Sequence, residues 1–293
     1  MPGQLQSSVL RSILCLACLF MCFGLCFGCS SSSKTEEKEK IAEEVSQEVE
    51  VGRNVAARLI GRFSLEESSS EWVKYVNLMG ALVATEFGRS ELKFHFAILK
   101  SPDINAFAAP GGYLFVTKGL LKELKSEAEL VAILAHEVGH VNEKHVYNKI
   151  QPKNRERGFT YVFARLLSFG AADLSGAIQE AATQGMELLV EKGLDPKAEF
   201  EADEAGVVFA STLGYDPRGL SRFLGRTTEA AHDFPKTHPA GKEREKLLAE
   251  ILKKNKLVER YLAIKEGARF EVTQKKRFDE VVLSTKKLDS TVW

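Results

Sequence analysis

The sequence has little cysteine, and all of it lies at one end. Its five cysteines fall within the first 29 residues, so the rest of the chain cannot form a disulfide. Lysine plus arginine equals aspartate plus glutamate at 40 each, and no long basic run occurs, so a nucleic-acid-binding role has no electrostatic support. Histidine is scarce, with six residues. A hydrophobic content of 44% excludes a disordered chain and suffices for one large core or two modest ones.

Four of the five cysteines lie in an apolar run, residues 13–28, that follows a single arginine, and Cys29 comes directly after this run. This run has the length of the hydrophobic region of a secretory signal and is short for a membrane span. Its end, Gly28-Cys29 followed by four serines, resembles a bacterial lipoprotein signal, in which the cysteine is lipidated and becomes the mature amino terminus. Cys26 stands where such signals usually have an aliphatic residue, so an uncleaved anchor and a plain signal peptide stay as alternatives. A metal site formed by the cysteines is a weaker alternative, because the apolar run offers them no histidine or polar partner. We expect residues 1–29 to be a lipoprotein-type signal with the lipid on Cys29.

Two of the six histidines stand four residues apart in the stretch Ala135-His136-Glu137-Val138-Gly139-His140. Residues four apart lie on one face of a helix, so both imidazoles can bind one metal ion. Zinc lowers the pKa of its bound water toward ~7, and Glu137 can accept the proton as that water attacks a peptide carbonyl. The alternative is a helix that carries two histidines by chance. A zinc enzyme needs a third protein ligand, so the rest of the chain must supply one.

The residues around this pair predict a helix. Ser126 and Glu129 form a capping box before an apolar run, and Pro152 marks the latest end of the helix. Gly139 inside the helix costs about 1 kcal/mol of helix propensity, which suggests that another element packs closely there.

A second helix can supply the third ligand. Asp195 and Pro196 predict its start as an N-cap and a first-turn proline, and Gly214 predicts its end. Glu199 and Asp203 stand four apart on it, so Glu199 can complete the zinc site while Asp203 hydrogen-bonds a ligand imidazole from outside. The alternative is a solvated acidic face.

The remaining pattern predicts more helices than strands. We interpret His95 as an ordinary strand residue, and His145, five residues after His140, as pointing away around the helix and not binding the metal. A strand beside the metal helix can pair with an extended substrate or form a purely structural hairpin, and both alternatives stay open. The expected segments are a polar tether over 30–40, helices over 41–60 and 72–87, strands over 92–98 and 111–117, helices over 154–193 that cover the cleft and can form a lid, a helix over 247–264, and a strand-bearing or loose tail over 267–293.

The two metal-binding helices together resemble peptidase family forty-eight of the zinc metallopeptidases, the group of HtpX, the CAAX prenyl endoprotease and the BepA-like and LoiP-like enzymes. The short LoiP-like lipoproteins match best in architecture, because the chain has no four-span membrane core and too few residues after His238 for a helical-repeat domain. The motifs that carry the resemblance, besides H-E-x-x-H, are Asn105–Phe107, Pro110–Tyr113, Thr117–Leu121, Ala198–Asp203, Gly214–Pro217, and Thr237-His238-Pro239 with Arg244.

The resemblance implies a gluzincin-type zincin fold, α+β and mainly helical, with a small sheet next to the zinc helix and one Zn²⁺ per chain. It also implies that His238 approaches the active site and either stabilises the oxyanion or blocks the open zinc position. We favour the oxyanion role, because an imidazole beside zinc can stabilise negative charge without displacing the catalytic water. Arg244 would support the transition state or the loop. On local evidence alone, His238 is an ordinary loop residue.

We therefore expect a metallopeptidase domain over residues 41–265 and a C-terminal tail over 266–293. The expected function is zinc-dependent endopeptidase action on misfolded or unassembled proteins, in a bacterial periplasm and anchored to a membrane by lipid. The alternative is a chaperone-like module that binds clients through a retained zinc site, but a pure binder has no need of the general base Glu137. A metzincin is excluded, because residues 143 and 146 are Glu and Val where that class needs Gly and His.

Overall fold

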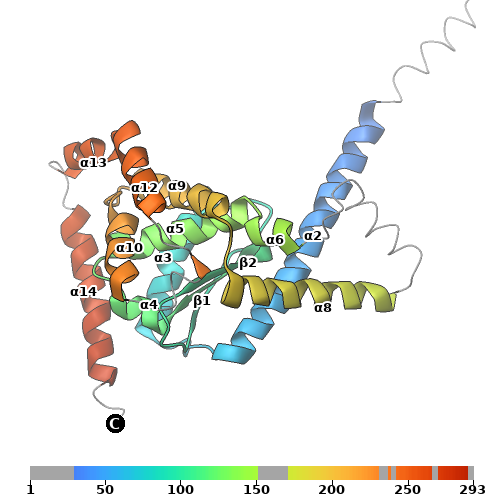
Figure 1. Ribbon diagram of the computed structural model, residues 1–293, viewed down its shortest axis with the longest axis horizontal. Coiled ribbons are helices and arrows are strands. Elements are labelled where there is room, and N and C mark those ends of the chain that lie inside the picture. The colour runs from blue at the N-terminus through green and yellow to red at the C-terminus, as the bar shows by residue number, and fades with distance from the viewer. Residues whose placement is uncertain (1–29, 151–170, 231–236, 239–241, 266–269, 290–293) are drawn as a thin grey trace, which may run out of the picture. The chain divides into compact units, whose positions relative to one another are not determined.

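The computed structural model describes residues 30–150, 171–230, 237–238, 242–265 and 270–289 (Figure 1). The chain divides into two compact units, residues 1–47 and residues 48–293. Helix α2 (Ser30–Phe63) begins in the first unit and continues into the second. The segment over 30–40 was expected as a polar tether, and it is helical instead, with residues 36–40 exposed. Its Lys and Glu residues are good helix formers, which explains why the helix starts early.

A three-stranded sheet forms the centre of the second unit, in the order β1-β3-β2. β1 (His95–Leu99) runs parallel to β3 (Tyr113–Thr117), and β2 (Ala106–Ala109) runs antiparallel to β3. The predicted strands are confirmed, although each starts two or three residues later than expected. The turn η1 (Pro110–Gly112) links β2 to β3, and both its glycines have positive φ, at 70° and 90°. The sequence pattern alone did not reveal β2, because all four of its residues are buried and none is polar.

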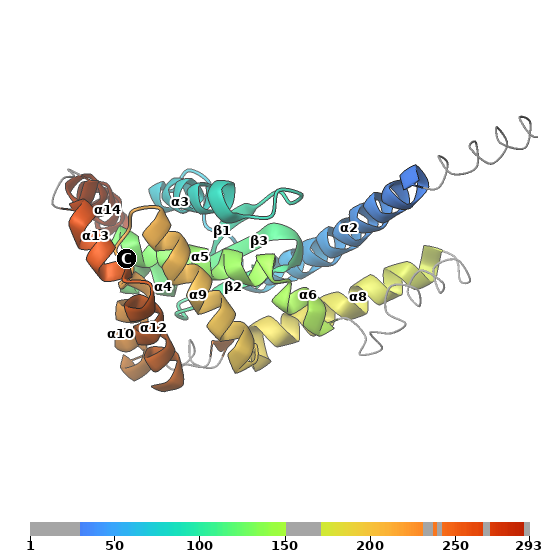
Figure 2. The ribbon, with the colours of Figure 1, turned by 90° about the horizontal axis from the view of Figure 1, so that it is seen from above.

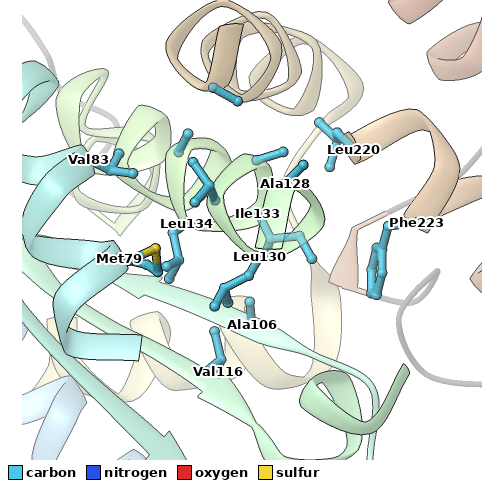
Figure 3. Close-up of a cluster of buried hydrophobic side chains, with 14 of the residues drawn as sticks. Met79, Val83, Ala106, Val116, Ala128, Leu130, Ile133, Leu134, Leu220 and Phe223 are labelled. Atoms are coloured by element: carbon cyan, nitrogen blue, oxygen red, sulfur yellow. The ribbon is translucent and has the colours of Figure 1, made fainter. Parts of the chain in front are cut away.

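Both faces of the sheet are covered by helices. On one face, Leu130 and Leu134 of α5 (Glu127–Asn142) and Met79 of α3 (Glu71–Phe87) pack toward Ala106 and Val116 of the strands (Figure 3). The other face packs against part of α2, α6 (His145–Ile150) and the π-helix η2 (Leu188–Lys192). Its buried residues include Leu99, Phe107, Ala109 and Phe115 from the strands, with Val51, Val55, Leu59, Val146 and Leu188 from the helices.

Helix α5 is buried along its length, from Glu127 to Val141. The predicted cap is confirmed, because Ser126 Oγ accepts a hydrogen bond from the Glu129 amide at 3.3 Å. α9 (Pro196–Thr212) packs against α5 (Figure 2), and α10 (Gly219–Ala230) also contacts it. The close packing expected at Gly139 is confirmed, since a Cβ there would lie 2.7 Å from the Cβ of Ala205.

The carboxyl-terminal part is more helical than the sequence predicted. The helix expected over 247–264 is two helices, α12 (Lys242–Lys254) and α13 (Leu257–Lys265), with a break at Lys256, whose φ is 50°. The tail expected to be loose or strand-bearing contains α14 (Phe270–Asp289). Both predictions were wrong. The reason for the second is tertiary, because Phe278 of α14 is buried against Trp72 of α3.

The first residue of α5 is held by three distant side chains. Glu127 is buried, and its carboxylate accepts hydrogen bonds from Tyr75 Oη at 2.7 Å and Tyr215 Oη at 2.9 Å. Arg277 of α14 donates to the same carboxylate, with its Nε at 2.7 Å. This network ties α3, α14 and the segment after α9 to the start of α5.

Of the helices expected over 154–193, residues 154–170 lie outside the described part of the chain. The rest is helical, as α8 (Ala171–Glu187) and η2. Arg58 donates to the side chains of Gln179 and Thr183, which joins α8 to α2. A lid role for this segment stays a prediction. The short helix α4 (Lys118–Glu123) connects β3 to α5, and none of the described helices has an apolar stretch long enough to cross a membrane.

Candidate metal centre

The two histidines of α5 point into one buried space. His136 Nε2 and His140 Nε2 lie 3.0 Å apart, and both side chains are buried. The same-face arrangement expected from their spacing is therefore present. Burial lowers the pKa of His140 well below its ordinary value, which favours the neutral imidazole that can bind a metal ion.

Helix α9 brings Glu199 to the same space. Its Oε1 lies 3.6 Å from His140 Nε2, and its Oε2 lies 3.7 Å from His136 Nε2. Glu199 and Asp203 belong to the buried stripe of α9, so the alternative of a solvated acidic face is wrong. Burial would raise the pKa of Glu199, but the nearby His238, His136 and Arg244 outweigh burial and lower it, which favours the ionised carboxylate.

The buried groups fit a divalent metal ion. Glu199 Oε1 and Glu137 Oε2 are buried without a hydrogen-bond partner, which is costly unless another group satisfies them. One nitrogen of each histidine and one carboxylate oxygen of Glu199 lie within 4.8 Å of one another, together with a nitrogen of His238. Two imidazoles and a carboxylate are a common ligand set for catalytic zinc. The cluster can therefore hold a metal ion.

Asp203 and Arg244 lie behind the histidines. Asp203 Oδ1 is 3.1 Å from His136 Nδ1, the nitrogen that faces away from His140. Both oxygens of Asp203 accept hydrogen bonds from Arg244, from Nε at 2.7 Å and from Nη2 at 2.6 Å. This two-pronged contact is the strong, planar geometry that arginine makes with a carboxylate. Another nitrogen of Arg244 lies 3.1 Å from Glu199, so one guanidinium steadies two carboxylates of the site.

His238 lies between Glu199, Glu137 and the sheet. Its Nδ1 is 3.2 Å from Glu199 Oε2, and its Nε2 is 3.3 Å from the Ala106 carbonyl oxygen of β2 and 3.9 Å from Glu137 Oε1. Burial would lower the pKa of His238, but the carboxylates of Glu199 and Glu137 raise it to about 9. Burial raises the pKa of Glu137. Pro235 and Pro239, which flank His238 in the sequence, lie outside the described residues, as does the proposed lipid site Cys29.

Sequence reasoning missed the placement of His145. It was expected to point away, but its Nδ1 lies 2.9 Å from His140 Nδ1. The expectation assumed that α5 continues to His145, whereas α5 ends at Asn142 and Lys144 has a φ of 54°, which turns the chain back. His95, in contrast, begins β1 and stacks on Tyr113 of β3, and it does not belong to the metal-binding cluster.

The chain is similar in sequence to proteins that are named as metalloendopeptidases and proteases. The chain is 32% identical over 163 residues to "Mitochondrial metalloendopeptidase OMA1" of Arabidopsis thaliana, covering 54% of this chain and 32% of that protein. A similarly named protein of Schizosaccharomyces pombe is 32% identical over 190 residues, covering 61% of this chain and 52% of the relative.

The "Beta-barrel assembly-enhancing protease" of Escherichia coli (strain K12) is 27% identical over 185 residues, covering 58% of this chain and 37% of the relative. The chain thus spans between a third and about half of the length of these relatives. The sequence model of Peptidase family M48 matches residues 71–252, which is more than half of the chain and includes every residue of the metal-binding cluster. The α+β, mainly helical fold with a small sheet beside the histidine helix agrees with this match, and the chain belongs to peptidase family M48.

Proposed function

We propose that the chain is a zinc-dependent endopeptidase. The observation that supports this most is the convergence of His136, His140 and Glu199 in one buried cluster, with Glu137 beside it. The relatives carry the names of a metalloendopeptidase and a protease, which agrees with the proposal. Because the matches cover a third to about half of those proteins, the activity of this chain is our inference.

Each residue of the cluster has a distinct role in this proposal. His136, His140 and Glu199 would hold the ion, and Asp203 would keep the His136 ring in place. When bound, zinc would polarise a peptide carbonyl and lower the pKa of a water molecule toward about 7. Glu137 Oε2, buried without a hydrogen-bond partner, is available to take the proton of the attacking water and pass it to the leaving amine.

Strand β2 is proposed as the place where a substrate binds. Within the described sheet it is an edge strand, paired only with β3, and it contacts α5. An extended polypeptide can add to such an edge through main-chain hydrogen bonds. The carbonyl of Ala106 on this strand faces His238.

We further propose that His238 holds the enzyme at low activity at rest. Its side chain is buried between the Ala106 carbonyl and Glu137, where the substrate backbone and the attacking water would need room. Its nitrogen also lies close enough to the ligand atoms to share the same ion. This geometry supports a blocking role over the oxyanion role that the sequence favoured.

The proposed substrates are misfolded or unassembled proteins, and the proposed location is a bacterial periplasm, with the chain anchored to a membrane by lipid on Cys29. The apolar run and the Gly28-Cys29 pair support the anchor. The name of one relative, a protease that enhances β-barrel assembly, supports clients that are still being assembled. The alternative is a chaperone-like module that binds clients without cutting them. It agrees with a site occupied by His238 but leaves Glu137 without a function.

The role of Glu137 is tested by Glu137→Gln. Glutamine fills the same space but cannot accept the proton, so we expect intact fold and metal content while casein cleavage falls by at least 10²–10⁴-fold. Digestion at the wild-type rate by this variant would refute the mechanism. The chaperone-like alternative would be supported if a His238→Ala variant, in which the proposed block is absent, cleaves no casein either with or without Glu137→Gln while both forms still bind the client.

The third ligand is tested by Glu199→Ala, with Glu204→Ala as the control, since Glu204 is an exposed acid on the same helix. Losing a ligand should weaken zinc affinity by more than the roughly 10–100-fold that loss of an outer partner costs. Metal analysis of both folded variants after dialysis measures this effect. Full zinc retention in Glu199→Ala would assign the third ligand to another residue.

The blocking role of His238 is tested by the sign of one kinetic change. His238→Ala should open the space between β2 and Glu137, so cleavage of an unfolded protein should rise. A fall in turnover of about 10²–10³, with little effect on substrate binding, would instead assign His238 to the oxyanion. Unchanged turnover would exclude both roles.

The lipid anchor is tested by palmitate labelling in bacteria. Cys29→Ser should abolish labelling and release or misprocess the protein, because the acylated atom is lost. Cys26→Ser, in the same apolar run, should still incorporate the label. Continued labelling of Cys29→Ser would show that the anchor assignment is wrong.

A further inference from the structure

A chain of three side chains leads away from the metal-binding cluster through His140. The Nδ1 atom of His140 lies 2.9 Å from Nδ1 of His145. The other ring nitrogen of His145, Nε2, lies 2.9 Å from Oε2 of Glu201 on α9. The contacts therefore run from a carboxylate, through one imidazole, to the imidazole of a candidate ligand.

This arrangement is built by the local fold. His145 begins α6, and the positive φ of Lys144 turns the chain so that its ring meets His140. A non-glycine residue adopts this left-handed conformation only at an energetic cost, so the surrounding contacts must maintain it. The His145 side chain is 9% exposed, although Glu201 reaches the surface. Lys197 contacts the other oxygen of Glu201, at 3.3 Å, which leaves Oε2 for His145.

The contacts constrain where the ring protons sit. An ionised Glu201 only accepts hydrogen bonds, so His145 Nε2 must carry a proton to donate to it. In the neutral ring Nδ1 of His145 is then an acceptor, and the proton between the two Nδ1 atoms belongs to His140. With Nδ1 protonated, Nε2 of a neutral His140 has a free lone pair, and this atom faces His136 and Glu199. If His145 Nδ1 donated to His140 Nδ1 instead, a neutral His140 would carry its proton on Nε2, and this proton would block metal binding.

We propose that His145 and Glu201 are positioning residues that fix the metal-binding tautomer of His140 and orient its ring. The inference rests on the proposed metal site. Helix α9 then serves both histidines, because Asp203 contacts His136 directly and Glu201 reaches His140 through His145. Glu199, Glu201 and Asp203 stand at alternate positions of one helix, and each has a different part in the same site.

The first test reads the tautomer directly in the full-length chain labelled with ¹⁵N-histidine. Long-range proton–nitrogen correlation spectra, with and without zinc, distinguish the two neutral tautomers and the doubly protonated ring. The six histidines are assigned by substituting each one in turn. We expect His145 to carry its proton on Nε2 in both states. A proton on Nδ1 of His145, alone or together with Nε2, would overturn the proposal, and this readout does not depend on catalysis.

The second test measures zinc affinity by competition with a chromophoric chelator. His145→Leu removes the acceptor for His140 and should weaken zinc affinity by roughly 10–100-fold, whereas His145→Gln should recover part of it, because its amide oxygen can accept the same hydrogen bond. His95→Leu is the control, since His95 lies outside the metal-binding cluster.

Glu201→Leu should also weaken zinc affinity, and Glu204→Leu, its exposed neighbour on α9, should not. Equal zinc affinity of folded His145→Leu and His95→Leu would overturn the positioning role of His145 but not the proposed metal site. Absence of zinc binding by the wild type would refute the site itself, so the two failures are distinguishable. If His145→Leu does not fold, the proposal is still tested by the tautomer spectra and by the comparison of zinc affinity between Glu201→Leu and Glu204→Leu.

Discussion

The close contact between α5 and α9 is the constraint on which the rest of the site depends. α5 carries His136, Glu137 and His140, and α9 carries Glu199 and Asp203. The contact is close because small residues face each other. A Cβ on Gly139 would lie 2.7 Å from Ala205 Cβ, and a Cβ on Gly206 would lie 2.9 Å from the Ala132 carbonyl oxygen. Larger residues there would separate the helices and hold the carboxylates away from the imidazoles.

This contact buries three carboxylates beside two groups that can carry positive charge. Glu137, Glu199 and Asp203 are all buried, Arg244 pairs with two of them, and His238, whose pKa is raised to about 9, contacts Glu199. Burying unpaired charges is costly, so a divalent cation would offset the remaining imbalance. Arg244 comes from α12 and also donates to the main-chain carbonyl of His238 at 3.3 Å. The carboxyl-terminal helices therefore hold both the outer carboxylate and the residue proposed to block the site.

The same helices fix the far end of α5. The buried Glu127 carboxylate accepts hydrogen bonds from two tyrosines and Arg277. The next residue of α14, Phe278, packs against Trp72 of α3. The three donors hold this carboxylate in one position, because any movement that breaks a hydrogen bond would leave buried negative charge unsatisfied. The start and the middle of the histidine helix are thus each held by groups distant in sequence, which suits a site whose ligands must stay within a narrow geometry.

Spacing within single elements could be read from the sequence, and contacts between elements could not. The pair at His136 and His140, the N-cap at Asp195 and the shared face of Glu199 and Asp203 depend on helix periodicity and local hydrogen bonds, so they could be predicted without a structure. Arg244 and His238 came from a family resemblance, and no local pattern placed them beside Asp203 and Glu199. The turn at Lys144 that brings His145 to His140, and the helix α14 that packs on Trp72, depend on contacts between elements that no local pattern predicts. A left-handed residue and a weakly patterned helix gain their stability from packing partners that lie far away in the chain.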